Sequence, residues 1–148
     1  MNTSPRSAYD MTSGMSYFPR MLDKIRLHAR GELPPDYHSF LGRGADGWCT
    51  GYLRVNYEAL RERVLAGGTD EEILQWCFEN GRKLEEADLF IWNSFAKKLG
   101  WNDVATPLVQ KLKRKSGLAE RDDIVTMFDY FDADEGRDAV GIRAPQTP

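Results

Sequence analysis

A cluster of acidic side chains near the C-terminal end is the part of this sequence most suggestive of chemistry. The stretch FDYFDADEGRD, residues 128–138, holds five carboxylates in eleven residues, with one glycine and one arginine. An EF-hand calcium loop needs oxygen ligands at its first, third and fifth positions, glycine at the sixth and glutamate at the twelfth. A loop that starts at Asp132 would place Gly136 fifth and Arg143 twelfth, so the calcium motif fails.

The same carboxylates have two other readings. A looser magnesium site on Asp132, Asp134 or Glu135 is an alternative, because Mg²⁺ often takes only one or two protein carboxylates. Acidic clusters on protein surfaces are common, however, so we predict no metal site. Phe128 and the aromatic residues around it should anchor the segment, and Arg137 can then form a bidentate pair with a neighbouring carboxylate.

A second polar set lies in the first helical segment. Arg20, Lys24 and His28 recur every four residues and therefore follow one side of a helix, with Asp23 beside them. A solvent-facing polar stripe is an equally plain interpretation. We predict that this helix and the acidic segment together form one ligand-binding cluster of mixed charge, made of Arg20, Asp23, Lys24, Asp134, Glu135 and Arg137.

Two functional hypotheses follow from this cluster. The preferred one is a small helical binding or interaction domain that recognises a small anionic ligand or a protein partner. The alternative is a small enzyme in which Asp134 or Glu135 acts as acid or base beside Lys24, with or without a divalent metal. The sequence identifies no catalytic residue, cofactor, substrate or oligomeric state, so whether the protein is an enzyme stays open. An enclosed cleft with a buried carboxylate would favour catalysis.

Composition narrows the class of protein. The chain has 148 residues, 41% hydrophobic and 11% aromatic, with a net charge of -3, which is typical of one globular domain. This balance disfavours a nucleic-acid partner, and the acidic start of the segment at 70–72 argues against a helix-turn-helix. The sequence also lacks the GxGxxG, P-loop and GxSxG motifs of dinucleotide, nucleotide and hydrolase sites.

The cysteines and the length of the apolar segments bear on where in the cell the protein is found. Cys49 and Cys77 form no CxxC pair, and with only two histidines the sequence offers neither a disulfide framework nor a zinc site. We expect two reduced, buried thiols in a cytoplasmic protein. No window approaches 18 apolar residues and the first residues lack an apolar leader, so we expect no membrane association.

The elements that must position these residues are helices. Pro19 suits a first helical turn, Asn56 an N-cap, and Thr69 with Glu72 a capping box. With glycines and apolar spacing, these signals predict helical segments within 17–31, 46–55, 56–67, 69–81, 84–99, 102–117 and 120–131. A brief strand is the alternative for the second. The intervening stretch at 32–47 carries Pro34, Pro35 and three glycines and is predicted to be a long loop, and long ordered loops are often functional. Its GRGADG run is best explained as a flexible connection rather than an anion site.

The segment at 84–99 has one apolar stripe, Leu84, Ala87, Ile91 and Phe95, which we expect to face the core. The sum is an all-α fold, a compact bundle of about six helices with one long Pro/Gly-rich loop and loose termini. We predict a flexible N-terminal arm at 1–14, a single helical domain at 15–137 and a flexible C-terminal tail at 138–148.

Three stretches resemble a known family. PRMLDKIR at 19–26, LAGGTDEEILQW at 65–76 and DDIVTMFDYFDADEGR at 122–137 are similar to motifs of a bacterial family of uncharacterised proteins, domain of unknown function 5069. The family's RMLDK element falls on residues 20–24 and its DEGR element on 134–137, and the resemblance runs over about 17–137. It implies a complete domain, but no activity, cofactor or catalytic residue.

Overall fold

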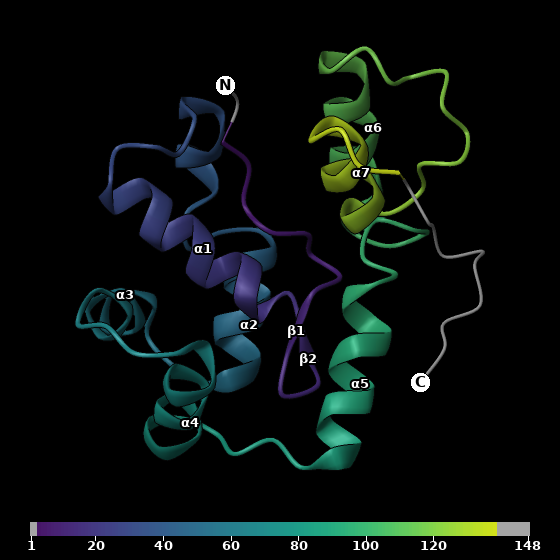
Figure 1. Cartoon of the computed structure of the whole chain (residues 1–148). Coiled ribbons are helices and arrows are strands. Elements are labelled where there is room, and N and C mark those ends of the chain that lie inside the picture. The colour runs from purple at the N-terminus through teal and green to yellow at the C-terminus, as the bar shows by residue number, and fades with distance from the viewer. Residues whose placement is uncertain (1–2, 139–148) are drawn as a thin grey trace. The chain divides into compact units, whose positions relative to one another are not determined.

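The fold is mostly helical. A computed structural model describes residues 3–138, which form seven α-helices, one short 3-10 helix and a two-stranded sheet (Figure 1). The prediction of a broadly all-α fold is confirmed. The chain divides into two compact units, Met1–Trp92 and Asn93–Pro148. The compact bundle, and the single domain at 15–137, therefore stay predictions.

The first unit opens with a short hairpin that begins inside the stretch 1–14, which was predicted as a flexible arm. Strands β1 (Met11–Thr12) and β2 (Met15–Ser16) pair antiparallel, with Met11 opposite Ser16. Ser13 and Gly14 form the two-residue turn at φ of 48° and 84°, the left-handed backbone that tight hairpins require. Ala8 and Thr12 are 0% and 2% exposed, so part of the predicted arm is buried.

Helix α1 (Phe18–Ala29) follows the hairpin directly. Pro19 lies in its first turn, as predicted, because a proline there removes no helical hydrogen bond. Phe18, Met21, Leu22 and Ile25 are at most 1% exposed. Leu27, on another face of the helix, is only 4% exposed, so α1 is contacted on more than one side.

The Pro/Gly-rich stretch contains more structure than predicted. Residues Pro35–Phe40 form the 3-10 helix η1, and helix α2 (Ala45–Leu53) begins within the GRGADG run, which excludes the brief strand. The aromatic ring of Tyr57 lies so close to Gly42 that a Cβ atom at this glycine would meet the ring at 2.8 Å. The segment is therefore held against the unit rather than left as an open connection.

Helices α3 (Tyr57–Leu65) and α4 (Asp70–Asn80) begin at the predicted caps. The Asn56 side chain accepts a hydrogen bond from the Ala59 amide, and Thr69 forms a complete capping box with Glu72. After α4 the chain passes very close to the end of α2, where the Arg82 amide donates to the Leu53 carbonyl at 2.8 Å.

Helix α5 (Glu86–Ala96) crosses the boundary between the units, and its inward face is not the predicted one. The expected core residue Ile91 is 55% exposed and Phe95 is 37% exposed, whereas Trp92 and Ala96 are 3% and 2% exposed. The reason is a polar anchor on the other side of the helix: the Trp92 indole donates to the Ser16 carbonyl at 2.8 Å.

The second unit contains helices α6 (Thr106–Lys115) and α7 (Met127–Asp134). Residues 120–126, predicted to open the last helix, are not helical. Instead the buried Lys113 ammonium donates to the carbonyls of Arg121 and Ile124 at 2.7 and 2.9 Å, and Thr126 caps α7. Among the residues described in both units, no helix is long and apolar enough to cross a membrane.

Candidate functional site

A buried carboxylate, Asp46, organises the polar interior of the first unit. Its Oδ1 atom accepts hydrogen bonds from the Tyr17 hydroxyl at 2.6 Å and the Lys24 ammonium at 3.0 Å. Its Oδ2 atom accepts from the Gly42 amide at 3.0 Å. Asp46 is 0% exposed and Lys24 is 4% exposed, so this is an ion pair removed from water. We call Tyr17, Lys24 and Asp46 the buried network.

Local structure places each member of this network. Tyr17 precedes α1 in a left-handed conformation, φ 74°, that is rare for a residue with a side chain, and Lys24 lies two turns later. Asp46 is in the first turn of α2, where a carboxylate also complements the helix dipole. Burial, with the Asp46 charge second, raises the pKa of the Tyr17 hydroxyl well above its usual value. The phenol therefore stays protonated as a donor.

The other two predicted residues of α1 meet the N-terminal segment. Arg20 is 1% exposed, and its Nη1 atom donates to the Arg6 carbonyl at 3.1 Å. Asp23 accepts a hydrogen bond from the Arg6 amide at 2.9 Å. One residue of the predicted arm is thus fastened to α1 by both its carbonyl and its amide.

The predicted C-terminal residues interact with one another in the second unit. Arg137 Nη1 lies 2.6 Å from Glu135 Oε1 and 3.6 Å from Asp132 Oδ1. The predicted pairing of Arg137 with a neighbouring carboxylate is confirmed. Asp134, in the last turn of α7, is exposed.

The six predicted ligand-binding residues fall in different units. Arg20, Asp23 and Lys24 belong to the first, and Asp134, Glu135 and Arg137 belong to the second. In the first unit Arg20 and Asp23 both bind Arg6 while Lys24 binds Asp46, and in the second Arg137 pairs with Glu135. The single cluster that would unite the six residues stays a prediction. Sequence reasoning missed Asp46 and Tyr17. The only signal was the acidic residue inside the GRGADG run, on a loop whose length already set it apart.

The metal-ligating side chains and the two cysteines are the next candidates for chemistry. Across residues 3–138 no group of three or more histidine, cysteine, aspartate or glutamate side chains is arranged to hold a metal ion. Cys49 and Cys77 are free thiols and both are buried. Burial raises the pKa of the Cys77 thiol to about 12 and that of Cys49 well above its usual value, so neither thiol is activated as a nucleophile.

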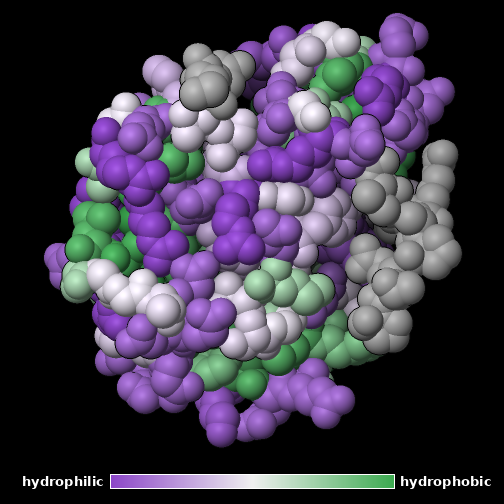
Figure 2. All heavy atoms as spheres, in the orientation of Figure 1, coloured by the Kyte–Doolittle hydropathy of each residue, from purple (hydrophilic) through white to green (hydrophobic). Residues whose placement is uncertain are grey.

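A different kind of feature lies on α5. Phe90 is 73% exposed and Ile91 is 55% exposed, with the exposed Ala87 one turn before them and Phe95 one turn after. We call these four residues the outer face of α5. Figure 2 shows one face of the molecule, on which hydrophilic residues predominate and hydrophobic residues form a few separate patches.

The opposite side of α5 is fixed within the first unit. The Tyr52 hydroxyl donates to the Asp88 carbonyl at 2.9 Å, and the Asp88 carboxylate pairs with Arg82 at 2.8 Å. The rings of Tyr52 and Trp92 stack with centroids 5.5 Å apart. These contacts determine the rotation of the helix about its axis and hence which residues form the outer face.

These features define a mostly helical chain that buries a few of its charged side chains and presents apolar side chains on one helix. The chain belongs to the family described as domain of unknown function (DUF5069), whose sequence model matches residues 2–137. The resemblance seen in the three motifs is thereby confirmed. A comparison with curated proteins found no match.

Proposed function

We propose that this chain is a protein-binding domain and that the outer face of α5 is its binding surface. The observation that carries the proposal is the pair Phe90 and Ile91, 73% and 55% exposed next to each other on one helix. Single exposed apolar residues are normal on proteins, but contiguous ones mark interaction sites. Phenylalanine is also enriched at such sites.

The anchoring of α5 supports the same proposal. The hydrogen bonds of Trp92 and Asp88 fix the helix, so its outer side chains are held in place before any partner arrives. A pre-organised surface loses less conformational freedom on binding, which leaves more of the contact energy as affinity. The proposal includes a cytoplasmic location, which the free thiols of Cys49 and Cys77 support.

The mixed-charge cluster remains a second proposal, with a small anionic ligand or a protein partner as its target. Arg20 and Lys24 are 1% and 4% exposed, so a ligand could reach them only if the chain around them moved. The same burial weighs against the enzyme alternative, in which a substrate would have to approach Lys24. This comparison favours the α5 surface as the site of binding.

A photo-crosslinking experiment tests the proposal. A photoreactive amino acid replaces Phe90 in the full chain in its host cell, and a matched variant carries it at the exposed Glu62 on α3. We expect a discrete adduct from position 90 only, and its loss when Ile91→Glu is added. Equal adducts from both positions, or none from position 90, would refute the assignment of α5 as the binding surface.

The charge cluster has its own test. Thermal shifts with phosphate and citrate are compared between wild type and Arg137→Gln, each against its own ligand-free melting temperature. Arg137 is better suited than Lys24, because loss of the buried Lys24 would lower stability directly. A ligand-induced rise that disappears in Arg137→Gln supports the cluster, and no rise in either protein argues against it.

A further inference from the structure

We propose that the partner of the outer face of α5 is a second copy of this chain, bound with the two α5 helices antiparallel. This inference rests on the protein-binding function proposed above and names its partner. The inference is based on the charged residues at the two ends of α5, in addition to the apolar residues between them.

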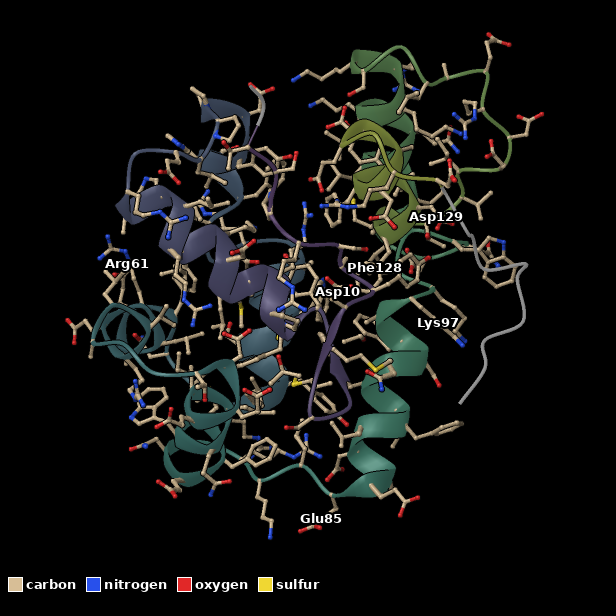
Figure 3. The ribbon with its side chains drawn as sticks, in the orientation of Figure 1. Asp10, Arg61, Glu85, Lys97, Phe128 and Asp129 are labelled. Carbon is tan, nitrogen blue, oxygen red and sulfur yellow. The ribbon has the colours of Figure 1, made fainter. Side chains whose placement is uncertain are left out.

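Acidic residues begin this helix and basic residues end it. Glu85 and Glu86 stand at the start, and Lys97 and Lys98 directly follow the last residue of α5. The helical hydrogen bonding reaches both pairs, since Leu89 donates to the Glu85 carbonyl at 3.0 Å and Lys97 to the Asn93 carbonyl at 3.3 Å. Figure 3 shows Glu85 and Lys97 at opposite ends of α5.

Helical spacing puts one charge of each sign on the same edge of the outer face. Glu86, Phe90 and Lys97 follow one another at intervals of four and seven residues, which return to nearly the same side of an α-helix. The apolar residues Phe90 and Ile91 therefore lie between a glutamate at one end and a lysine at the other. An apolar centre with a charged rim is the usual anatomy of a protein interface.

Symmetry then selects the orientation. In a two-fold dimer the same surface is used by both copies, so a contact from residue i to residue j occurs twice. If the two helices are antiparallel and cross at their middle, between Ile91 and Trp92, Glu86 of each copy lies opposite Lys97 of the other. In a parallel two-fold dimer this edge of one copy would lie across the interface from the same edge of the other, so the contact between Glu86 and Lys97 would not form.

Self-complementarity favours a second copy over an unrelated protein. A surface that binds a different protein needs to be complementary only to that protein. The outer face of α5 is complementary to itself, because antiparallel pairing places Glu86 of each copy opposite Lys97 of the other. α5 has 11 residues, which at 1.5 Å per residue gives a contact only about 16 Å long. An interface of this size is small, so we expect a dimer that dissociates on dilution.

Oligomeric state tests the inference on the full chain. Sedimentation velocity across a roughly hundredfold concentration range should show wild type moving from monomer to dimer. Ile91→Glu should stay monomeric throughout, while Leu65→Glu, at a 44% exposed residue on α3, should behave like wild type. A wild type that stays monomeric at the highest concentration, or a dimer that survives Ile91→Glu, overturns the proposal.

Charge reversal gives a sharper test that does not depend on apolar substitutions. Glu86→Lys alone and Lys97→Glu alone each create two like-charge contacts in an antiparallel dimer, and each variant should dissociate at least several-fold more easily than wild type. An equimolar mixture of the two variants restores both opposite-charge contacts, so it should form a mixed dimer of wild-type strength. A mixture no stronger than its components overturns the antiparallel pairing.

The two proposals fail in different ways. Photo-crosslinking at position 90 to a different protein, with wild type monomeric at every concentration, overturns the second copy and leaves the protein-binding function in place. Crosslinking of two copies together supports both. Far-UV circular dichroism and melting curves of each variant verify folding, and the charge variants, which alter the exposed Glu86 and the half-buried Lys97, carry the test if Ile91→Glu does not fold.

Discussion

Removal of the Asp46 carboxylate should destabilise the first unit more than any surface change. Asp46→Ala takes away the acceptor that the Tyr17 hydroxyl, the Lys24 ammonium and the Gly42 amide share. Breaking a buried ion pair by deleting one partner costs about 3–5 kcal/mol, because the remaining charge stays in a poorly solvating environment. A domain of this kind has only about 5–15 kcal/mol of total stability, so the loss should be large.

The assays are equilibrium urea unfolding and thermal unfolding, each followed by tryptophan fluorescence and circular dichroism. At about 2–4 °C per kcal/mol for a chain of this size, the melting temperature should fall by roughly 6–20 °C. Lys24→Met and the double variant Lys24→Met/Asp46→Ala complete a double-mutant cycle. The double variant should lose clearly less than the sum of the single losses, since it leaves no buried ammonium at this position.

Two results would refute this reasoning. An Asp46→Ala loss below about 1 kcal/mol would mean that water or other groups solvate Lys24 well enough to replace the carboxylate. Strictly additive losses in the cycle would mean that the 3.0 Å contact between Lys24 and Asp46 carries no coupling energy. Surface Asp123→Asn serves as the reference, because Asp123 is exposed and its loss should leave the urea midpoint at neutral pH almost unchanged.

Three further predictions concern particular contacts. Gly81→Ala should cost at least about 1–3 kcal/mol, because a Cβ would lie 2.2 Å from the Leu53 carbonyl oxygen, whereas Gly51→Ala, with open space around it in α2, should be neutral or stabilising; urea midpoints check both. Lys113→Met should speed amide hydrogen exchange in residues 118–126, because two buried carbonyls lose their donor. The folded pKa of Cys77 is about 12, above the value near 8.5 of an unfolded thiol, so the unfolded chain loses its proton first as pH rises. Stability from this thiol is therefore full below about pH 8.5 and declines between there and pH 12, and Cys77→Ala should flatten that decline in urea midpoints measured from pH 8 to 10. Unchanged exchange rates, or identical alkaline slopes, would contradict the second and third predictions.

Helix boundaries were the most predictable part of this fold. The caps at Asn56 and Thr69 and the proline at the start of α1 act within a few residues of themselves, so their geometry is encoded locally. The start of α7 was missed by several residues for the opposite reason. Lys113 draws residues 121–124 out of the helix through bonds that span 8 and 11 positions.

The orientation of α5 could not be predicted from periodicity. Leu89, Phe90, Ile91 and Trp92 are four consecutive apolar residues, so the helix has apolar side chains on most of its circumference and two faces compete for the core. The decision comes from a hydrogen bond between Trp92 and Ser16, 76 positions apart. A contact at that separation leaves no periodic trace in the sequence.

The buried network was hidden for a similar reason. Lys24 was singled out as a ligand-binding residue, but its partner Asp46 lies 22 positions away, and Tyr17, whose hydroxyl also binds Asp46, lies 29 positions from Asp46. Both interpretations of the α1 cations, as part of a ligand-binding cluster or as a solvent-facing polar stripe, treated these side chains as accessible. In the structure Lys24 is 4% exposed and paired, so its charge serves the interior of the first unit.

Lys24 was expected to be accessible and is buried, whereas Ile91 was expected in the core and is exposed. This exchange bears on which surface binds a partner. Buried ion pairs seldom add net stability, because desolvation offsets most of their attraction, and apolar replacements of similar volume are often as stable. If Lys24→Met with Asp46→Leu is at least as stable as wild type and still dimerises through α5, the buried network is dispensable for both. If that variant is equally stable but no longer dimerises, the network must act on the position of α5, and folding and binding are then linked through the interior of the first unit.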